Sequence, residues 1–551
     1  MLNRELSWHL HTISVLLELS DENFFKVRAF RNASREIKRL TRPVTAMLED
    51  GSIEHVEGVG SGIIGVLREL VETGKSSLLD ELRHEVSPAL VELASIPGIG
   101  AKTARSLVGE LGVQNIAELE AAAEAGKVRE LPGFGPKKEQ SILEGIKLLR
   151  SRGSLAPIGI SRPLAEVLVR LVRQYEWVAA AEIAGSVRRW QELNADIDLI
   201  AATADPDGLA RALEQIKGID IDELDGEKLL LKTSMGLSVR IWLVPESQFA
   251  LHWLQFTGSK GHVEALRALG SLKGETEADI YRHLGLHPVP PELRQPDLDL
   301  KRFHLESTPP ALLTEADIRG DLHMHTLWSD GVLDIAELAE LCHKRGYEYI
   351  AITDHSPSLA IARGLSEDKL SLQLAQIRAR QHQYPLTVLA GIEVDIRNDG
   401  SLDLPDSLLA KLDWVVASVH SQFKMSREQM TARIEKAMAN PHVNVIGHPS
   451  GRLLQRRPGY DLDWERMFAA ALRTNTALEV NSSPDRLDIN DKLIAQAIEK
   501  GVKLVISTDA HSGNELDNIR FGVATARRAG AGSEHILNCM SLAQLNRHLK
   551  S

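Results

Sequence analysis

Histidines and carboxylates recur after residue 319, and nearly every one of them follows directly on a short apolar segment. They lie in the stretches DLHMHTLWSDG, TDHS, GIEVD, SVHS, GHPSG and STDAHS. Imidazole and carboxylate groups without thiolates suit Zn²⁺, Mn²⁺ or Fe²⁺, and several such ions together can activate water for hydrolysis. We therefore predict a multinuclear hydrolytic metal site with these ligands: His323, His325, Asp330, His355, Glu393, His420, His448, Asp509 and His511.

A second candidate site begins in the stretch NADIDLIAAT, residues 194–203. Asp196 and Asp198 are two residues apart in an apolar run typical of a strand, so both carboxylates point to one face. The upstream stretch GSVRRW places a Gly-Ser turn and two arginines close by. Paired carboxylates beside such a turn suggest Mg²⁺ and a nucleotide. A site of this kind needs a third carboxylate from a neighbouring strand.

Both sets of residues need a scaffold, and the hydrophobic pattern predicts one for each. After residue 319, short apolar strands alternate with helices, which is typical of a parallel β/α barrel-like domain. The carboxyl ends of its strands converge on one mouth, where the nine side chains would gather. Residues 155–245 mix strands with helices, residues 246–300 return to helix, and a Pro- and Leu-rich connector follows.

The first 150 residues are predicted to be nearly all helix and contain a weak internal repeat. The stretches VEGVGSGIIGVLREL, IPGIGAKTARSLVGEL and LPGFGPKKEQSILEGI each carry a Gly-x-Gly turn before a helix. The glycines allow a tight hairpin, and the N–H groups at the helix start can hold one phosphate without reading bases. Three copies favour binding of a DNA backbone over plain helix connections, through these glycines: Gly58, Gly60, Gly98, Gly100, Gly133 and Gly135.

The composition is that of an ordinary globular protein. The 551 residues are enough for several domains, and 43% hydrophobic with 25% charged residues is a normal balance. The net charge of −12 argues against a general basic coat for nucleic acid. Two cysteines far apart argue against a disulfide framework and fit a reducing cytoplasm. No stretch approaches the roughly 20 apolar residues of a membrane span, and the N-terminus is predicted to be an amphipathic helix rather than a signal peptide.

The set of nine ligands resembles that of the PHP (polymerase and histidinol phosphatase) phosphoesterases. The resemblance covers about 230 residues and implies a distorted β/α barrel with a trinuclear metal centre. Up to three Mn²⁺ or Zn²⁺ ions are therefore expected. All nine expected positions carry a ligand residue, which implies an active site. Such ions lower the pKa of bound water and neutralise phosphoryl oxygens during in-line attack.

The upstream half resembles family X DNA polymerases, on the hairpin repeats and the stretches GSVRRW, ADIDL and FTGSKGH. The whole layout is similar to bacterial family X polymerases with a PHP exonuclease. The implied fold is multidomain: a helical helix-hairpin-helix N-terminal region, an α+β nucleotidyltransferase-like palm with a small helical thumb, and the C-terminal distorted β/α barrel. The expected domains are 1–90 (N-terminal helical DNA-binding domain), 91–153 (hairpin fingers), 154–245 (palm), 246–300 (shortened thumb), 301–318 (linker) and 319–551 (PHP).

The family resemblance also implies roles at the second site. Two aspartates would hold metal ions, and the upstream turn would contact the triphosphate of a dNTP. The residues concerned are Asp196, Asp198, Gly185, Ser186 and Arg189.

The third carboxylate of that family lies in a strand of the form G-x-x-V-D-L-R, which in this chain is GLSVRIWLV. Arg240 takes the place of the carboxylate, and Trp242 takes the place of the usual arginine. A guanidinium beside the two aspartates supplies positive charge and competes with a metal through bidentate pairing. We therefore expect impaired synthesis and no firm Mg²⁺ site in the palm. The acids of DIDELD, residues 220–225, are expected in a strand end and turn rather than as substitutes.

These observations lead to one leading hypothesis and three alternatives. The leading hypothesis is a cytoplasmic DNA-repair 3′–5′ exonuclease that acts on gapped, nicked or 3′-ended duplex, while its polymerase-like half mainly holds the DNA backbone. The first alternative is an active gap-filling polymerase with a PHP editing exonuclease, and the second is a non-catalytic DNA-end scaffold. A small-molecule phosphatase is disfavoured by the three DNA-type hairpins. No membrane partner is expected.

Overall fold

The computed structural model describes residues 3–40, 42–152 and 155–548. The chain divides into two compact units. The first holds the residues up to Ala156, Ile160–Val187 and Leu193–His252, and the second holds Pro157–Gly159, Arg188–Glu192 and everything from Trp253 onwards. The predicted boundary between residues 153 and 154 lies outside the described residues. The six expected domain ranges are finer than this division and stay predictions.

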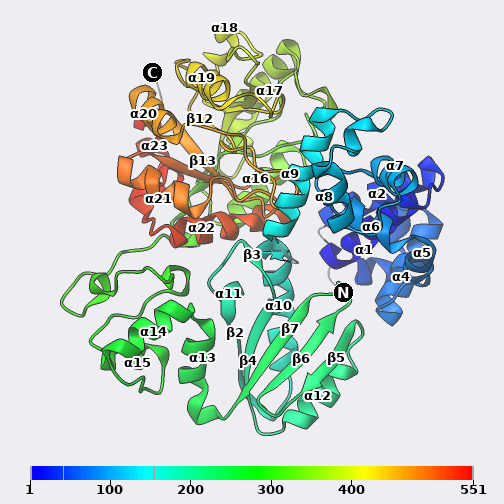
Figure 1. Cartoon of the computed structure of the whole chain (residues 1–551). Coiled ribbons are helices and arrows are strands. Elements are labelled where there is room, and N and C mark those ends of the chain that lie inside the picture. Colours follow the sequence, from blue (N-terminus) through cyan, green and yellow to red (C-terminus); the bar gives the residue numbers. More distant parts are fainter. Residues whose placement is uncertain (1–2, 41, 153–154, 549–551) are drawn as a thin grey trace. The chain divides into compact units, whose positions relative to one another are not determined.

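Helices make up the N-terminal part of the first unit (Figure 1). Apolar residues at helical spacing form its core, as Leu6, Leu10 and Leu17 of the first helix show. Polar side chains cap several helices. Asn115, for example, accepts a hydrogen bond from a backbone N–H of the first turn of α8. The helices are α1 (Asn3–Leu19), α2 (Phe24–Arg39), α3 (Val44–Glu49), α4 (Ser61–Thr73), α5 (Ser77–Glu85), α6 (Pro88–Ala94), α7 (Ala101–Leu111), α8 (Ile116–Glu124) and α9 (Pro136–Arg152).

Among the described residues, a five-stranded sheet completes the first unit, with its strands in the order β2-β4-β7-β6-β5 (Figure 1). Strands β4 and β7 are parallel neighbours, and the other pairs are antiparallel. This mixture of strands and helices confirms the α+β class that the sequence indicates. The strands are β2 (Val178–Ile183), β4 (Ile197–Thr203), β5 (Ile219–Leu224), β6 (Lys228–Thr233) and β7 (Ser238–Val244), and the helices are α10 (Ile158–Val172), α11 (Gly185–Arg188) and α12 (Pro206–Glu214).

The acidic stretch DIDELD forms a strand end and a turn with exposed acids, as predicted. Its residues up to Leu224 belong to the edge strand β5, which pairs along its length with β6. The turn begins only at Asp225, whose carboxylate accepts a hydrogen bond from the backbone N–H of Lys228 at 3.0 Å. One face of an edge strand is normally buried. In β5 the buried side chain is that of Ile219, and the acidic side chains are exposed.

Three helices follow the sheet, as the sequence predicts: α13 (Phe249–Thr257), α14 (Lys260–Leu269) and α15 (Glu277–His283). The predicted linker comes next, and it is packed rather than loose. Phe303 is buried, and the backbone N–H of Leu313 donates to the carbonyl of Ala531 at 2.9 Å. The connector therefore lies against the C-terminal domain.

A parallel barrel dominates the second unit (green to red in Figure 1), with its strands in chain order. Each strand is parallel to its neighbours. Beyond the last strand, a parallel bridge joins Met324 to Ala510 and brings the first and last strand segments together. This nearly closed ring confirms the distorted β/α barrel. The strands are β8 (Gly320–Asp321), β9 (Tyr349–Ile352), β10 (Thr387–Asp395), β11 (Trp414–Ser418), β12 (Val445–Ile446), β13 (Ala477–Asn481) and β14 (Leu504–Ser507).

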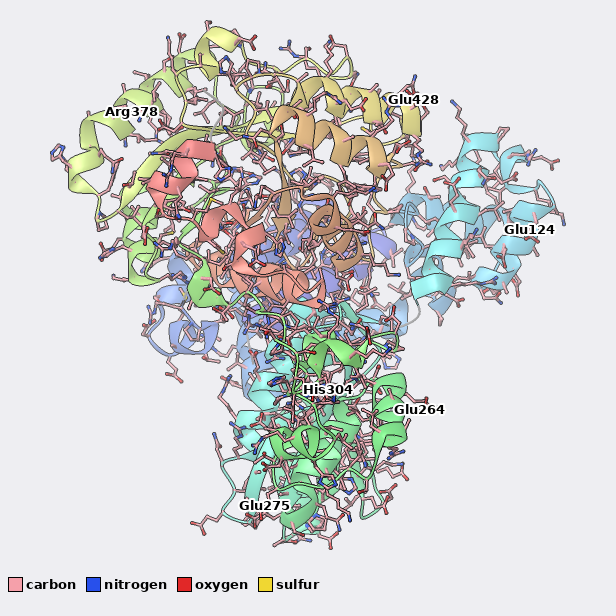
Figure 2. All side chains as sticks on the ribbon, turned by 90° about the vertical axis from the view of Figure 1, so that its left-hand side faces the viewer. Glu124, Glu264, Glu275, His304, Arg378 and Glu428 are labelled. Atoms are coloured by element: carbon pink, nitrogen blue, oxygen red, sulfur yellow. The ribbon has the colours of Figure 1, made fainter. Side chains whose placement is uncertain are left out.

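Two layers of apolar side chains hold the barrel together. Ile350 of β9 belongs to the layer between strands and helices, whereas its neighbour Tyr349 belongs with Trp414 to the second layer. Figure 2 shows Arg378 and Glu428 extending outward from α17 and α19. Among the described helices, none has the length and apolar composition needed to cross a membrane. The helices of the barrel are α16 (Ile335–Lys344), α17 (Glu367–Arg380), α18 (Asp406–Leu409), α19 (Arg427–Met438), α20 (Trp464–Thr474), α21 (Asp491–Lys500), α22 (Ile519–Arg528) and α23 (Leu542–His548).

Candidate functional site

The nine predicted metal ligands lie together at the carboxyl ends of the barrel strands. His323 and His325 follow β8, His355 follows β9, and Glu393 lies near the end of β10. Parallel β/α barrels present their functional side chains at this edge. Asp330 lies in the loop after β8. The remaining four ligands come from later loops of the same domain: His420, His448, Asp509 and His511.

The ligand atoms are close enough to share metal ions. Within the described residues, three overlapping groups have ligand atoms that all lie within 4.8 Å of one another. Nε2 of His448 lies 3.1 Å from Glu393, and Nε2 of His325 lies 3.1 Å from Asp509. His448 and Asp509 therefore belong to the same cluster as the three groups. The nine residues therefore form one cluster, named the metal cage below. The groups are His325–Asp330–His355–His511, His323–His325–Glu393 and His355–Glu393–His420.

Two carboxylates that the sequence analysis did not select orient the histidines of the cage. Glu479 of β13 lies 2.7 Å from Nδ1 of His323, and it accepts a hydrogen bond from the backbone N–H of His448 at 2.6 Å. Asp395 of β10 lies 3.1 Å from Nδ1 of His420. A carboxylate on one ring nitrogen directs the other nitrogen toward the site and makes it a more basic ligand. Both acids occur in apolar strand stretches, ALEVN and GIEVD, where a buried charge requires a partner.

Two cage residues have backbone conformations that side chains rarely adopt. The φ angle is 29° at His448 and 56° at Asp509. The surrounding barrel holds the second of these in place, because the backbone N–H of Asp509 donates to the carbonyl of His323 at 2.9 Å. Such conformations persist only where the surroundings enforce them, and they gather at functional sites.

The electrostatics of the cage favour cations. Burial alone would raise the pKa of Glu393 and of Asp509, but the surrounding histidines outweigh it and hold both pKa values well below the ordinary range. Burial also opposes the charged form of His323, yet the carboxylates of Glu479 and of the two acidic ligands keep the pKa of His323 well above its ordinary value. Buried negative charge of this kind requires positive charge beside it.

Several buried atoms of the cage have no hydrogen-bond partner within the described residues. They include Nε2 of His323, Nδ1 of His325 and Nδ1 of His448. Buried polar atoms are normally paired, so a cluster of unpaired ring nitrogens indicates metal ligands. Histidine and carboxylate donors without thiolates fit Zn²⁺, Mn²⁺ or Fe²⁺. The residues present therefore fit a metal centre.

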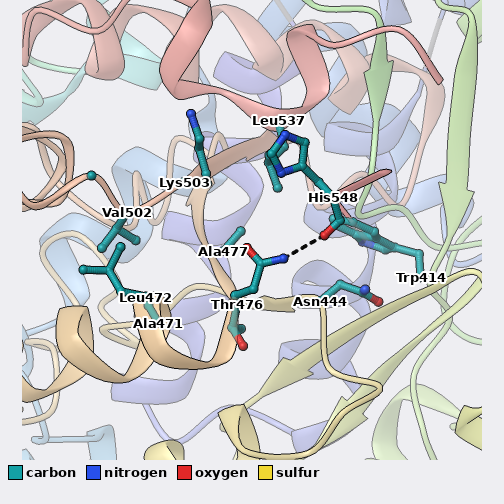
Figure 3. Close-up of a pocket in the computed structure, with 12 residues that line it drawn as sticks. Trp414, Asn444, Ala471, Leu472, Thr476, Ala477, Val502, Lys503, Leu537 and His548 are labelled. Carbon is teal, nitrogen blue, oxygen red and sulfur yellow. Dashed lines mark hydrogen bonds between the residues drawn. The ribbon is translucent and has the colours of Figure 1, made fainter. Parts of the chain in front are cut away.

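A small pocket of the barrel lies at the opposite end of the strands (Figure 3). Its volume is about 60 Å³, and its lining includes Trp414 at the start of β11, Ala477 at the start of β13 and Lys503 just before β14. Asn475, which also lines it, donates to the carbonyl of His548 at 2.9 Å. Because these residues mark the amino ends of the strands, the pocket has no part in the chemistry of the cage.

The paired carboxylates of the sheet are satisfied by a guanidinium. Asp198 of β4 stands in register with Arg240 of the parallel strand β7. Arg240 donates from Nη1 to Asp198 at 2.7 Å and from Nη2 to Asp196 at 3.0 Å. The indole N–H of Trp242 donates to Asp198 at 3.2 Å. Arg240 therefore bridges the two aspartates, which is the pairing that the sequence indicates.

Asp198 is the more enclosed member of the pair. Burial and the nearby charge of Asp196 raise the pKa of Asp198, while Arg240 opposes that shift. Gly185 packs directly against this carboxylate with a φ of 59°. A Cβ at Gly185 would lie 2.4 Å from Oδ2 of Asp198, so only glycine fits there.

The remaining residues expected to contact a nucleotide have structural partners. The hydroxyl of Ser186 donates to Oδ1 of Asn194 at 2.7 Å. Arg189 belongs to the second unit, where its Nη1 donates to the carbonyl of Thr257. Neither contact tests a role toward a triphosphate, which stays a prediction.

Each Gly-x-Gly turn precedes a helix, as the repeat in the sequence indicates. The second glycine of each pair stands directly before α4, α7 or α9. The first N–H groups of a helix lack intrahelical partners, so these turns can present them to an anion. Pro136 opens α9 and removes one donor, so the third turn offers fewer N–H groups. The first glycine of each pair has a positive φ: 79° at Gly58, 90° at Gly98 and 77° at Gly133.

Family comparisons match three parts of the chain. A family described as "Helix-hairpin-helix domain" matches residues 1–76, and one described as "SAM-like Helix-hairpin-helix tandem" matches residues 90–148. A family described as "PHP domain" matches residues 321–483. The last match begins at β8 and ends just after β13, so it includes most of the barrel and seven of the nine cage residues.

Curated relatives cover more of the chain. The DNA polymerase/3′-5′ exonuclease PolX of Bacillus subtilis (strain 168) is 37% identical over 564 residues, which cover 98% of each chain. A probable phosphatase of Thermoanaerobacter sp. (strain X514) is 32% identical over 242 residues, 42% of this chain and 94% of its own length. Among solved structures, a ternary P/T complex of Leishmania infantum polymerase beta covers 38% of this chain and 98% of its own at 19% identity. Its TM-score of 0.24 is too low to support an argument.

The Bacillus subtilis similarity covers 98% of this chain, so it includes the hairpin region, the sheet and the barrel. The hairpin and PHP matches fall on the helical region and the barrel. The chain therefore belongs to the family of PolX, the bacterial family X DNA polymerases/3′-5′ exonucleases with a C-terminal PHP domain.

Proposed function

We propose that this protein is a DNA-repair enzyme that removes nucleotides from 3′ ends with a metal-dependent 3′–5′ exonuclease site in its barrel. The observation that carries this proposal is the convergence of nine histidines and carboxylates in one cage that attracts cations. Up to three Mn²⁺ or Zn²⁺ ions would occupy it. Such ions supply hydroxide near neutral pH and positive charge beside phosphoryl oxygens. The proposed ligands are His323, His325, Asp330, His355, Glu393, His420, His448, Asp509 and His511.

The names of the relatives agree with phosphoester chemistry. One is called a DNA polymerase/3′-5′ exonuclease and another a probable phosphatase. In this chain, Glu479 and Asp395 would hold the imidazoles of His323 and His420 in the orientation for binding metal. These two carboxylates act on the ligands rather than on DNA.

DNA is the proposed substrate because of the three hairpins. Their helix N-termini would bind phosphates of gapped, nicked or 3′-ended duplex without reading its bases. Positively charged side chains near two turns, Lys102 and Lys137, are exposed and would add to this attraction. The second hairpin combines exposed N–H groups with the first of these lysines, so it is the best candidate for the main contact.

We further propose that the sheet has lost most of its capacity for DNA synthesis. Two-metal phosphoryl transfer needs two ions roughly 3.5–4 Å apart. Arg240 supplies a fixed positive charge between Asp196 and Asp198, and it does so where such an ion would bind. An Mg²⁺ ion would have to displace both hydrogen bonds of the guanidinium. A dNTP held by Gly185, Ser186 and Arg189 would then lack its metal.

The domain ranges and the location complete the proposal. Residues 1–90 and 91–153 would bind DNA, 154–245 and 246–300 would form the palm and its short thumb, 301–318 would connect them to the nuclease, and 319–551 would form the PHP domain. A protein that processes chromosomal DNA in bacteria works in the cytoplasm, which is the proposed location.

A single reaction tests the proposed function. Wild-type protein is incubated with a gapped duplex labelled at the 5′ end of the primer, in Mn²⁺, with and without dNTPs. We expect stepwise shortening of the primer under both conditions and no lengthening. Lengthening that requires dNTPs would replace this proposal with the gap-filling polymerase. Binding of the duplex without any shortening, by protein that contains metal, would favour the scaffold.

A further inference from the structure

Large apolar side chains are exposed in two loops that follow ligands of the metal cage. Leu327 and Val332 lie in the loop after β8 and are 55% and 39% exposed, and Ile361 lies in the loop after β9 and is 92% exposed. We name these three residues the apolar rim. Among the described residues of the barrel, two further large apolar side chains are exposed, Leu372 of α17 and Leu472 of α20. Isolated exposed side chains are ordinary, but three in the loops around one site indicate a binding surface.

The loop after β8 holds Leu327 and Val332 beside the cage. The backbone N–H of Leu327 donates to the carbonyl of Leu333 at 2.9 Å, so the two arms of the loop are paired. The backbone N–H of Val332 donates to the carbonyl of His511, a proposed metal ligand, at 2.9 Å. Asp330 lies between the two rim residues in the sequence and belongs to the same group of ligands as His511. Both rim residues are therefore fixed next to that group.

The loop after β9 starts from a ligand and returns to it. The backbone N–H of Leu365 donates to the carbonyl of His355 at 2.7 Å, which closes the loop. Nε2 of His355 lies 3.5 Å from Oδ1 of Asp330, so the first parts of the two loops meet at the cage. Ile361 lies between these closing residues, with its side chain almost entirely in solvent. The rim thus extends from one loop to the next.

The loop after β11 carries an aromatic ring, but other side chains already contact it. The guanidinium of Arg457 lies 3.7 Å from the ring centre of Phe423. The ring of Tyr460 is stacked with Phe423 at 6.3 Å between the ring centres. A flat ligand would have to compete with these contacts in order to use Phe423. The apolar rim offers exposed surface without such competition.

We propose that the apolar rim contacts the base of the 3′-terminal nucleotide while the phosphate of that nucleotide lies at the metal cage. The base is the part of the terminal nucleotide that presents apolar surface, and its faces are similar in all four nucleotides. The rim would therefore accept any base. A paired base is covered by its stacked neighbour, so the rim would favour unpaired 3′ ends. This inference rests on the proposed exonuclease function and adds the feature of the substrate that the site selects.

The first experiment compares L327N/V332T with L472N in the full-length, Mn²⁺-loaded protein. The new side chains keep nearly the same size and shape but are polar. Leu472 is a matched control, because it is 50% exposed and lines the pocket at the opposite end of the strands. We expect L327N/V332T to raise KM for a single-stranded oligonucleotide about 5- to 20-fold, with a smaller change in kcat, and I361N to raise it about 2- to 5-fold. L472N should match wild type.

An oligonucleotide whose 3′-terminal nucleotide lacks a base separates contact with the base from other effects. On this substrate, wild type should show a raised KM, and L327N/V332T should match wild type because the contact is absent from both. Elemental analysis should give equal metal content for all proteins. If L327N/V332T raises KM equally for both oligonucleotides, or raises it for neither, the inference is wrong.

Binding of small ligands tests the rim without hydrolysis. Titration calorimetry compares thymidine 5′-monophosphate with 2-deoxyribose 5-phosphate, which lacks the base. We expect wild type to bind the nucleotide about tenfold more tightly than the sugar phosphate, and L327N/V332T to bind both about equally. Wild type that shows this preference but releases no nucleotide from DNA would refute the exonuclease function and leave the rim in place. Wild type without the preference would refute the rim, whatever its activity.

A second copy of the chain is the other occupant that the rim could accept. Sedimentation velocity of wild type and of L327N/V332T over a range of concentrations tests it. We expect the two proteins to sediment identically. A dimer of wild type that L327N/V332T disrupts would assign the rim to a contact between copies and overturn the inference.

Discussion

The barrel and the sheet both bury carboxylates, but they compensate the negative charge in different ways. In the barrel, Glu393 and Asp509 face histidine rings, and several of the ring nitrogens lack partners within the described residues. In the sheet, Arg240 donates to both aspartates. Acidic residues at strand ends therefore indicate a metal only where no neighbouring side chain already supplies the positive charge.

The kind of cation also matters. A metal ion can exchange its water for a phosphate oxygen, whereas a guanidinium is held by its own backbone and stays protonated at any physiological pH. Arg240 is in register with Asp198 on a paired strand, so its backbone keeps the guanidinium beside the two aspartates. A metal ion in the barrel could therefore exchange its ligands, whereas the guanidinium in the sheet remains paired with the two aspartates. The following changes test this contrast.

Removing ligands from the cage should have the largest effect. We expect the double substitution of His323 and His325 by Ala to reduce metal content and to lower nuclease activity to background, because one group of the cage loses two of its three ligands. Binding of gapped duplex should be nearly unchanged, since the hairpins are intact. Elemental analysis, a nuclease assay and a binding titration measure the three quantities. A double mutant that degrades DNA at the wild-type rate would place the activity elsewhere.

Loosening a ligand should have an intermediate effect. Glu479→Gln keeps the shape of the side chain but removes the charge that holds Nδ1 of His323. We expect the affinity for Mn²⁺ to fall about 10- to 100-fold, with activity restored by excess metal. A metal titration followed by activity and by calorimetry measures both effects. Activity that is lost and not restored at high Mn²⁺ would indicate a role for Glu479 other than orienting the ligand.

Blocking a hairpin should affect DNA binding and leave the cage alone. We expect joint replacement of Gly98 and Gly100 by Val to weaken binding about tenfold and to flatten its dependence on salt, because phosphate contacts are lost. Gly109 lies in α7, the helix that follows this turn, and a Cβ there meets open space, so Gly109→Ala serves as a control. Nuclease activity on a short single strand should persist. Affinity equal to wild type would mean that the turns only connect helices.

Changing the sheet carboxylates should have the smallest effect on the nuclease. We expect Asp196→Ala to remove nucleotides at the wild-type rate, and we expect neither this variant nor wild type to extend a primer in Mg²⁺ with dNTPs. A primer-extension gel and an exonuclease assay on the same duplex give both results. Extension by wild type that disappears in the variant would show that the sheet tolerates Arg240 and binds catalytic metal.

The sequence reveals the cage because nearly every ligand follows a short apolar strand, and the ends of parallel strands lie side by side in a barrel. Glu479 and Asp395 were missed, since an acid inside a strand gains meaning only from the neighbouring strand. The pairing of Arg240 with the aspartates could be predicted because the resemblance to family X polymerases placed Arg240 at the position of the third carboxylate, and the strand register agrees with that placement.

The fold shows a similar limit. Strand and helix patterns predict the α+β sheet and the barrel, but of the edge strand β5 only its end was predicted, because most of its residues are acidic or exposed. The membership of Glu192 in the unit of the barrel depends on a partner 260 residues away, and local patterns contain no such information. Packing between distant segments is decided by shape and charge in three dimensions.

The bridge between Met324 and Ala510 has a consequence for the order in which the parts of the chain fold during synthesis. It joins the first and last strand segments of the barrel, and His325 meets Asp509, which lies 184 residues later. Contacts so distant in sequence form late in folding. A ribosome must release the last strand before the cage can exist. A partly synthesised chain can therefore carry folded hairpins that grip DNA while it has no means of cutting it.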